Sequence, residues 1–393
     1  MTLRVAIAGG GIGGFAAALT LSRGGNDVTL FEKAPAFMEI GAGIQLGPNV
    51  TRILQGWGLL DSLCQVASTP ERLQVRSATT GGLLGELRLG QAMLDRYGAP
   101  YLTLHRADLH GVLLQAVQQT TATIQTNSAV QSFQQTSESV SVQTSFGAQE
   151  VDVLIGADGL WSNTREHLLN DGAPSSTGHL AYRALIKQAD LPEPLRSQNG
   201  TAWLGPNMHS VQYPVRGGEW LNVVVFVHGN VPSDFQNWDH SANAADLKTA
   251  LQGSCNALQD VIRTATDWRL WVMHDRPPMQ GAHQMAQGRV AVLGDAAHPM
   301  RPYLAQGAGM AIEDAAELGL ALNGTTPKNA SAALPQYATN RWQRNARVQA
   351  RALRNGQIFH ATGPVRWGRD AAMKLMGERL LNMPWLYGYR RSL

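Results

Sequence analysis

The chain has 393 residues, of which 44% are hydrophobic and 16% are charged, and its formal net charge is +3. This length suits two or three ordinary domains, and the composition is that of a folded globular protein, not of a disordered chain. The Lys and Arg residues form no basic tract, which argues against nucleic acid as a partner.

The two cysteines, Cys64 and Cys255, lack the spacing of a zinc site or of a disulfide framework. We therefore expect no bound metal and a reducing, cytoplasmic setting. No apolar stretch reaches the roughly 18 residues that are needed to cross a bilayer, so we also expect no membrane span.

Residues 3–32 predict a strand, a glycine turn, a helix and a second strand, which together form a βαβ unit. The turn at residues 9–14 satisfies the pattern G-x-G-x-x-G. Gly9 permits the tight turn, Gly11 lets the backbone approach a pyrophosphate, and Gly14 lets the helix pack closely on the strand. The motif predicts a dinucleotide site, and a glycine turn without a ligand is the alternative.

Glu32 ends the second strand, where a carboxylate can accept hydrogen bonds from a ribose 2′-hydroxyl. Its neighbour Lys33 is a further candidate for cofactor binding. NAD and FAD share this arrangement, so these residues alone leave the identity of the dinucleotide open.

Later parts of the chain predict further elements. Residues 149–156 and 289–294 are apolar runs that each end in glycine near an aspartate, and we expect both to be buried strands of the same sheet. Residues 176–277 predict a mainly antiparallel sheet, and a helical pattern begins at Gly307. Within the helical tail, a series at helical spacing predicts a solvated helix face: Arg341, Arg344, Arg347, Arg351 and Arg354.

Two further motifs carry a resemblance to a known family. Residues 156–165, GADGLWSNTR, contain D-G-x-x-S-x-x-R after a predicted strand, and residues 294–299, GDAAHP, follow a later one. Together with the glycine turn, they resemble the class A flavoprotein aromatic monooxygenases, the para-hydroxybenzoate hydroxylase-like group. The resemblance covers essentially the whole chain, including residues 385–389, which recur in the 3-hydroxybenzoate group.

The resemblance implies FAD as the cofactor and an α/β fold. A Rossmann-like FAD-binding domain is expected over residues 1–175 and 278–330. A mainly antiparallel substrate domain is expected over residues 176–277, to which residues 70–105 can add strands. A helical C-terminal region follows over residues 331–393.

The resemblance also implies roles for residues around the flavin. Asp295 accepts a hydrogen bond from the ribityl chain, and Arg106 lies near the sugar and phosphate oxygens, which suit a guanidinium. Asp158 contributes to packing and to the binding of both FAD and NAD(P)H. Gly307 and Ala308 begin a helix whose positive end faces the flavin.

Gly43 lies in a loop that this family folds over the isoalloxazine ring. Ordinary glycine-rich connections are the alternative for this loop and for the start of the helix at Gly307. Because no second G-x-G-x-x-G is present, NADH or NADPH is expected to bind transiently as a co-substrate.

Residues 207–218 resemble the strand that faces the substrate in 3-hydroxybenzoate 6-hydroxylases. At strand spacing His209, Val211 and Tyr213 share one face. A neutral imidazole at His209 can accept a phenolic proton, and Tyr213 and Gln45 are candidates to orient the substrate. The alternative is that His209 is a core histidine with satisfied hydrogen bonds.

The substrate pocket combines features of several relatives. Pro302 stands where 3-hydroxybenzoate 6-hydroxylases carry a glutamine, and Gln45 stands where 6-hydroxynicotinate 3-monooxygenases carry a loop histidine. Salicylate, 3-hydroxybenzoate and hydroxynicotinate all remain possible substrates. The resemblance implies that one oxygen atom of O2 enters a hydroxylated aromatic acid through a flavin C4a-hydroperoxide.

Two further questions stay open on the sequence alone. A flavin reductase or dehydrogenase on the same fold, and a sensor without catalytic activity, are the alternative functions. A homodimer could bury Trp367, Trp385 and Tyr387 of the C-terminal tail, or these side chains could pack on the core of their own chain.

Overall fold

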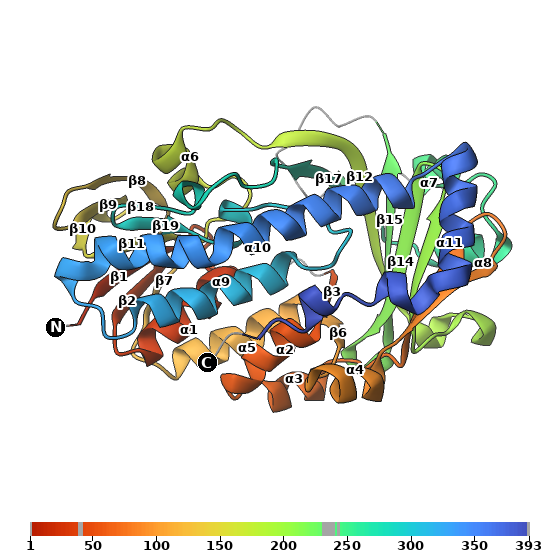
Figure 1. Ribbon diagram of the computed structural model, residues 1–393, viewed down its shortest axis with the longest axis horizontal. Coiled ribbons are helices and arrows are strands. Elements are labelled where there is room, and N and C mark those ends of the chain that lie inside the picture. The colour runs from red at the N-terminus through yellow and green to blue at the C-terminus, as the bar shows by residue number, and fades with distance from the viewer. Residues whose placement is uncertain (1, 38–41, 230–239, 242–243, 391–393) are drawn as a thin grey trace.

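The glycine turn joins β1 (Arg4–Ala8) to α1 (Ile12–Arg23) in the computed structural model, which describes residues 2–37, 42–229, 240–241 and 244–390 (Figure 1). β1 lies inside a six-stranded sheet in the order β18-β19-β11-β1-β2-β7. All neighbouring pairs are parallel except the edge pair of β18 and β19. The remaining strands of this sheet are β2 (Asp27–Phe31), β7 (Thr123–Gln125), β11 (Val153–Gly156), β18 (Ala286–Gln287) and β19 (Val290–Val292).

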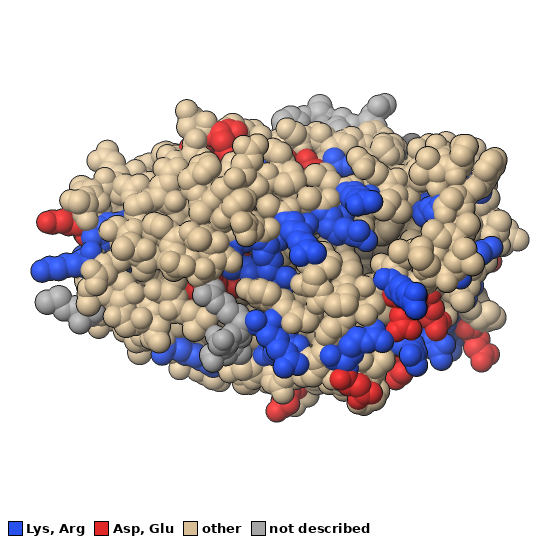
Figure 2. All heavy atoms as spheres, viewed as in Figure 1, with Lys and Arg blue, Asp and Glu red and all other residues tan. Residues whose placement is uncertain are grey.

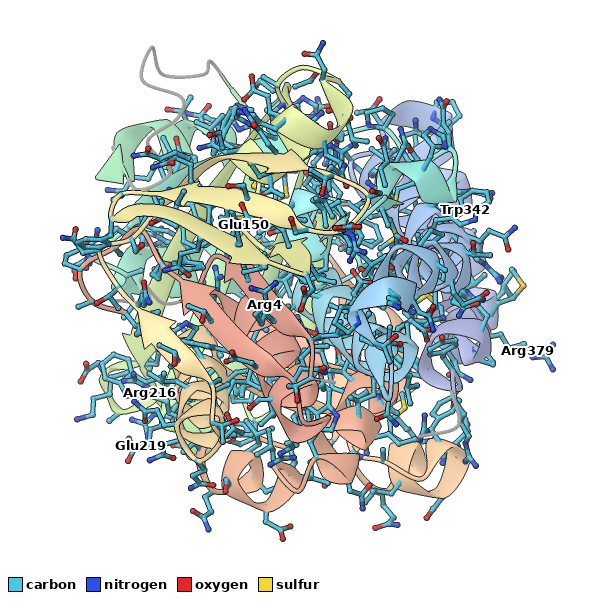
Figure 3. All side chains as sticks on the ribbon, turned by 90° about the vertical axis from the view of Figure 1, so that its left-hand side faces the viewer. Arg4, Glu150, Arg216, Glu219, Trp342 and Arg379 are labelled. Atoms are coloured by element: carbon cyan, nitrogen blue, oxygen red, sulfur yellow. The ribbon has the colours of Figure 1, made fainter. Side chains whose placement is uncertain are left out.

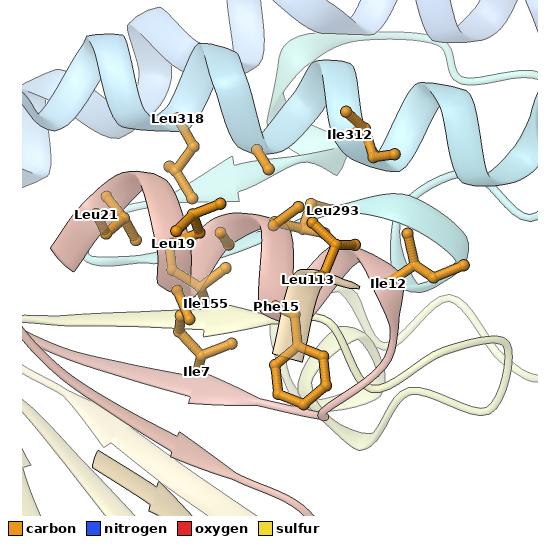
Figure 4. Close-up of a cluster of buried hydrophobic side chains, with 14 of the residues drawn as sticks. Ile7, Ile12, Phe15, Leu19, Leu21, Leu113, Ile155, Leu293, Ile312 and Leu318 are labelled. Atoms are coloured by element: carbon orange, nitrogen blue, oxygen red, sulfur yellow. The ribbon is translucent and has the colours of Figure 1, made fainter. Parts of the chain in front are cut away.

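Helices cover one face of this sheet and build the largest core. They are α1, α5 (Arg106–Gln118), α9 (Gly307–Leu322) and α10 (Ala330–Phe359). Phe15, Leu19 and Ile312 are among the side chains that meet there (Figure 4). Burying a leucine of this kind contributes about 1.5–3 kcal/mol. This core therefore fixes α1, and with it the glycine turn, against the sheet.

A three-stranded sheet covers the opposite face. It consists of β8 (Val130–Gln135), β9 (Val140–Thr144) and β10 (Gly147–Val151). The prediction of one strand over residues 149–156 is wrong, because the run divides at Asp152 between this sheet and β11. The Asp152 backbone N–H donates to the carbonyl of Arg4, and its carboxylate forms an ion pair with the Arg4 side chain at 2.9 Å. Arg4 lies at this end of the molecule (Figure 3).

An eight-stranded sheet forms the second large layer, in the order β16-β17-β12-β15-β14-β13-β4-β5. It is antiparallel except where β13 pairs with β4, which confirms a mainly antiparallel sheet. Its strands are β4 (Arg72–Ser77), β5 (Leu83–Arg88), β12 (Ser175–Lys187), β13 (Gly200–Gly205), β14 (Met208–Val215), β15 (Trp220–His228), β16 (His240–Ser241) and β17 (Arg269–Asp275). The short pair β3 (Gly43–Leu46) and β6 (Leu102–His105) lies between the two large sheets.

The other helices surround these layers. They are α2 (Pro48–Gly56), α3 (Leu60–Val66), α4 (Gly90–Tyr97), α6 (Asn163–Leu169), α7 (Ala244–Ala250), α8 (Asn256–Thr264), α11 (Gly363–Leu381) and α12 (Pro384–Tyr387). α10 is the longest helix described and runs from the six-stranded sheet to the eight-stranded one (Figure 1). Among the described residues, no helix combines the length and apolar character that crossing a bilayer requires.

The aromatic residues of the C-terminal tail have different surroundings. Tyr387 is buried, and the guanidinium of Arg347 lies over the Trp385 ring at 4.1 Å. Trp367 on α11 is 67% exposed. Two of the three rings therefore pack on their own chain, and a homodimer stays a prediction.

A buried ion cluster joins α9 to α10. Arg341 contacts Glu313 at 2.8 Å and Asp314 at 2.7 Å, and all three side chains are fully buried. Arg344 contacts Glu313 at 2.6 Å. The prediction of a solvated face is therefore wrong for Arg341, because the two carboxylates of α9 face it. Arg347 and Arg354 are exposed, and Figure 2 shows Lys and Arg side chains gathered over α10.

The electrostatics of this cluster favour the charged forms. Burial alone would raise the pKa of the Asp314 carboxyl, but His298 and Arg341 hold that pKa below its usual range. Burial would likewise raise the pKa of Glu313, and Arg341 and Arg344 lower it. The carboxylates are thus ionised in the folded chain and depend on their cationic partners.

Replacing Arg341 by Met should therefore be strongly destabilising, because it leaves two buried carboxylates with fewer cationic partners. We expect the free energy of unfolding at neutral pH, measured by urea denaturation, to fall by about 3–5 kcal/mol. The matched control is Arg379→Met on α11, at an exposed arginine of the molecular edge (Figure 3). It should change the free energy by less than about 0.5 kcal/mol.

The pH dependence distinguishes lost ion pairing from lost packing. Because the folded pKa values of Glu313 and Asp314 are lowered, their stabilisation is present above the unfolded pKa values and is lost as pH falls. The stability difference between wild type and Arg341→Met should shrink as pH falls below about 4. A difference that stays constant with pH would show that the ion pairs contribute nothing.

Candidate active site

A cavity of about 400 Å³ lies where the carboxyl ends of β1, β11 and β19 face the eight-stranded sheet. One wall comes from segments that follow the parallel strands, and the other comes from β12, β14, β15 and β17. Most of the predicted site residues meet in this cavity. They are Gly11, Gly43, Gln45, Arg106, Tyr213, Asp295, Gly307 and Ala308.

The glycine turn requires glycine for two different reasons. Gly9 has φ +102°, and a Cβ there would lie 2.4 Å from the carbonyl oxygen of Ala157. A Cβ on Gly14 would lie 1.9 Å from the carbonyl oxygen of Gly9. A Cβ on Gly11 would meet nothing within 4 Å, so its backbone stays open toward the cavity.

Glu32, which directly follows β2, holds this turn in place through hydrogen bonds. Its Oε2 accepts a hydrogen bond from the Gly10 N–H at 2.7 Å, and its Oε1 accepts one from the Ala34 N–H at 2.8 Å. Lys33 is exposed. Neither Glu32 nor Lys33 is among the described residues that line the cavity, and a contact of Glu32 with a ribose stays a prediction.

Asp158 contacts its own segment. Its Oδ2 accepts hydrogen bonds from the Thr164 N–H at 3.0 Å and the Thr164 hydroxyl at 2.9 Å, at the start of α6. Arg165 forms an ion pair with Asp171 and donates to the carbonyl oxygen of Ala296 at 3.2 Å. These contacts attach the D-G-x-x-S-x-x-R segment to the turn that carries Asp295.

Asp295 lies beside the first turn of α9. Its Oδ1 is 4.0 Å from the position that a Cβ on Gly307 would occupy. The preceding residue, Gly294, has φ +58° and donates its N–H to Asp314 at 3.1 Å. A carboxylate and a helix N-terminus thus share one side of the cavity.

The short strand β3 brings two predicted residues to the opposite wall. The Gly43 N–H donates to Asn222 at 2.7 Å, and a Cβ on Gly43 would lie 2.6 Å from the Tyr213 ring. Gln45 accepts a hydrogen bond from the Tyr101 hydroxyl at 2.7 Å. Burial raises the pKa of the Tyr213 hydroxyl, which keeps it a donor at neutral pH. Gly41 of this loop lies outside the described residues.

A second cavity, of about 440 Å³, adjoins the first and is mostly apolar. Gln45, Val211, Pro302 and Ala305 line both. His209 lines the second cavity, whereas Tyr213 lines the first. Val211, which lies between them on β14, therefore marks the boundary of the two spaces.

His209 is 1% exposed, and its ring stacks on Phe226 with ring centres 4.5 Å apart. Its Nδ1 lies 2.6 Å from Nε2 of His360, and its Nε2 has no hydrogen-bond partner among the described residues. Burial, together with His360 and His179, lowers the pKa of His209 well below its usual range. The ring is therefore neutral.

Arg183 on β12 is a cavity residue that the sequence did not reveal. Its guanidinium lies 3.7 Å from the centre of the Trp271 ring. Burial lowers the pKa of Arg183 to about 10, and the nearby Arg106 adds to this effect. Arg183 remains a cation at neutral pH, so two guanidinium groups line the same cavity. An arginine within an ordinary strand pattern carries no local signal of this position.

Comparison with known proteins agrees with this geometry. Residues 2–352 match the family described as FAD binding domain. The chain is 39% identical to a 3-hydroxybenzoate 6-hydroxylase of Polaromonas naphthalenivorans strain CJ2, across 98% of this chain and 96% of that protein. It is 35% identical to a 6-hydroxynicotinate 3-monooxygenase of Bordetella bronchiseptica, across 88% of this chain and 89% of that protein.

The solved structure of a salicylate hydroxylase substrate complex superposes with a TM-score of 0.84. It is 28% identical and covers 99% of this chain and 96% of its own. The chain belongs to the family of FAD-dependent aromatic hydroxylases. The predicted family, fold class and FAD cofactor are thereby confirmed.

The cavity of this hydroxylase suits FAD. Gly11 leaves backbone open to the cavity, and the helix that starts at Ile12 presents free N–H groups there. Arg106 and Asp295 also line the cavity, and a guanidinium and a carboxylate are the groups that suit phosphate oxygens and sugar hydroxyls respectively.

Replacing Gly11 by Val should remove FAD without unfolding the chain. The extended backbone at Gly11, with φ −77° and ψ −174°, tolerates a β-branched residue, but the side chain would occupy the cavity. We expect the flavin absorbance per chain to fall severalfold while the far-ultraviolet circular dichroism is unchanged. The control is Gly111→Val on α5, where an added Cβ also meets nothing within 4 Å. Full flavin content in Gly11→Val would show that the dinucleotide lies elsewhere.

Proposed function

We propose that this hydroxylase uses NADH or NADPH and O2 to add one oxygen atom to a hydroxylated aromatic acid, with 3-hydroxybenzoate as the first candidate. The observation that carries the proposal is the half-buried cation Arg183, which lies against Trp271 in the same cavity as Tyr213. An aromatic carboxylate matches this combination of one guanidinium, aromatic walls and a phenolic donor. The name of the relative with 39% identity supports the choice of 3-hydroxybenzoate.

Gly11, Arg106, Asp295 and Gly307 would hold FAD along the wall formed by the parallel strands. When bound and reduced by NAD(P)H, the flavin supplies activated oxygen for transfer to the ring. The residues of the eight-stranded sheet then determine how the ring is oriented. This division assigns the cofactor to one wall and the substrate to the other.

His209 is the proposed proton acceptor. With a hydrogen on Nδ1 donated to His360, its Nε2 is a buried acceptor without a partner among the described residues, and a ring hydroxyl bound against it would give its proton to that atom. Loss of that proton raises the electron density of the ring carbons and so favours attack on an electrophilic oxygen. Tyr213 and Gln45 are proposed to orient the substrate, because Gln45 lines both cavities and Tyr213 lines the first one beside Arg183.

A hydroxypyridine carboxylate such as 6-hydroxynicotinate is the second candidate substrate. It offers the same hydroxyl, ring and carboxylate, and the relative with 35% identity is named for that reaction. A flavin reductase or dehydrogenase would use the same cofactor wall but would insert no oxygen.

A substrate panel tests the proposed function directly. Purified protein with bound FAD is supplied with NADH or NADPH and, in turn, with 3-hydroxybenzoate, salicylate and 6-hydroxynicotinate. We expect one acid to stimulate NAD(P)H oxidation, with oxygen consumption equal to hydroxylated product. NAD(P)H oxidation without a hydroxylated product would support a reductase instead. If none of the acids stimulates NAD(P)H oxidation, the proposal is wrong.

The variant His209→Gln tests the proton acceptor. Glutamine keeps polar atoms in the pocket but cannot take up the hydroxyl proton, so kcat for hydroxylation should fall by a factor of about 100 or more. Flavin content should match that of wild type, since His209 does not line the first cavity. The control is His167→Gln at an exposed position on α6, which should keep wild-type turnover. Wild-type kcat in His209→Gln would rule out this role.

A further inference from the structure

Three histidines from separate elements converge next to His209, which lines the second cavity. His179 lies on β12, His228 lies directly opposite it on β15, and His360 follows the last turn of α10. One ring nitrogen from each lies within 4.8 Å of the others. We propose that these three imidazoles form a binding site for a divalent transition-metal ion of the Zn²⁺ type.

The three ring nitrogens lie within 4.8 Å of one another, and one pair already has the spacing that such an ion requires. Nδ1 of His360 lies 3.3 Å from Nε2 of His228. Two nitrogens on a tetrahedral zinc ion are separated by roughly the same distance, because each Zn–N bond measures about 2.0–2.1 Å. Three nitrogen ligands favour zinc or copper, whereas Mg²⁺ and Ca²⁺ prefer oxygen ligands.

Neighbouring side chains orient the two buried rings. Nδ1 of His179 contacts the Tyr303 hydroxyl, which leaves Nε2 of that ring for an ion. Nε2 of His360 contacts His209 at 2.6 Å, which leaves Nδ1 for an ion. Histidine ligands in metal sites generally use the second ring nitrogen in this way. His228 is exposed, so an ion can reach the site from solvent.

The local charges permit a cation. Burial lowers the pKa of His179 to about 4 and that of His360 to about 3, and it also lowers the pKa of His228. All three rings are therefore unprotonated at neutral pH, and binding releases no proton from them. Arg301 and Arg369 are positive charges near His360, and the guanidinium of Arg301 forms an ion pair with Asp275 at 2.6 Å.

Calorimetric titration of the FAD-loaded, chelator-treated protein with ZnCl2 tests the site. We expect one ion per chain with a dissociation constant in the micromolar range or tighter. His228→Ala should weaken binding at least about tenfold. This exposed position tolerates alanine, so the variant should fold. His283→Ala, at an exposed histidine of the short helix Ala282–Gln284, is the matched control and should bind zinc as wild type does.

The location of the ion provides a second readout. A zinc-soaked crystal should show an anomalous peak among the three rings. Absence of saturable one-to-one binding, wild-type affinity in His228→Ala, or a peak at another position would each overturn the proposed site.

The site also predicts an effect on turnover, and this step rests on the proposed role of His209. A metal on Nδ1 of His360 leaves the hydrogen of that ring on Nε2, where it donates to Nδ1 of His209. His209 must then carry its own hydrogen on Nε2 and cannot accept the substrate proton there. Zinc should therefore inhibit hydroxylation in wild type at concentrations that leave the rate of His228→Ala close to that variant's own zinc-free rate.

The two proposals can fail separately. One-to-one zinc binding without inhibition would contradict the proton-accepting role of His209 and leave the metal site intact. The protein could instead bind no zinc, and its turnover could respond neither to zinc nor to the substitution of His228. That result would overturn the metal site and leave the proposed function intact.

Discussion

The Asp314 carboxylate is the group on which the geometry of the active site depends most directly. It accepts hydrogen bonds from the Gly294 N–H at 3.1 Å and from Arg341 at 2.7 Å, and it contacts His298 at 2.5 Å. Through these contacts one side chain of α9 fixes both the turn that carries Asp295 and the position of α10. Buried ion pairs of this kind add little net stability, but removing one partner strongly lowers the free energy of unfolding. Their effect here is to determine where α9 begins relative to β19.

This anchoring explains why the site lies where it does. The carboxyl ends of neighbouring parallel strands meet at one edge of a sheet, and the segments after β1, β11 and β19 supply the cofactor wall. The eight-stranded sheet closes the cavity from the other side with longer, aromatic and charged side chains. Chemistry between a bound flavin and a substrate requires that these two walls keep a fixed separation. α10, which spans both layers, provides a rigid link between them (Figure 1).

The features that could be predicted from the sequence are those that depend on local pattern. Glycine spacing at residues 9–14 indicates a tight turn because only glycine fits the close contacts at Gly9 and Gly14. Apolar runs likewise indicate buried strands. Pairings between distant residues leave no such signal: Arg341 looks like part of an exposed series until Glu313 and Asp314 face it. Arg183 also looks ordinary on its strand, and the break at Asp152 depends on Arg4.

The histidines show this limit most clearly, since residues 179, 209, 228 and 360 share no motif and meet only in the folded chain. Their proximity has a chemical consequence beyond packing. A neutral imidazole carries one hydrogen, so the ring of His360 can donate toward His209 or toward His228, but not toward both. A ligand at the exposed end that fixes the tautomer of His360 would therefore fix the direction of both hydrogen bonds in the row. In the proposed function, the availability of Nε2 of His209 would thus depend on a ring two positions away, at the surface of the molecule.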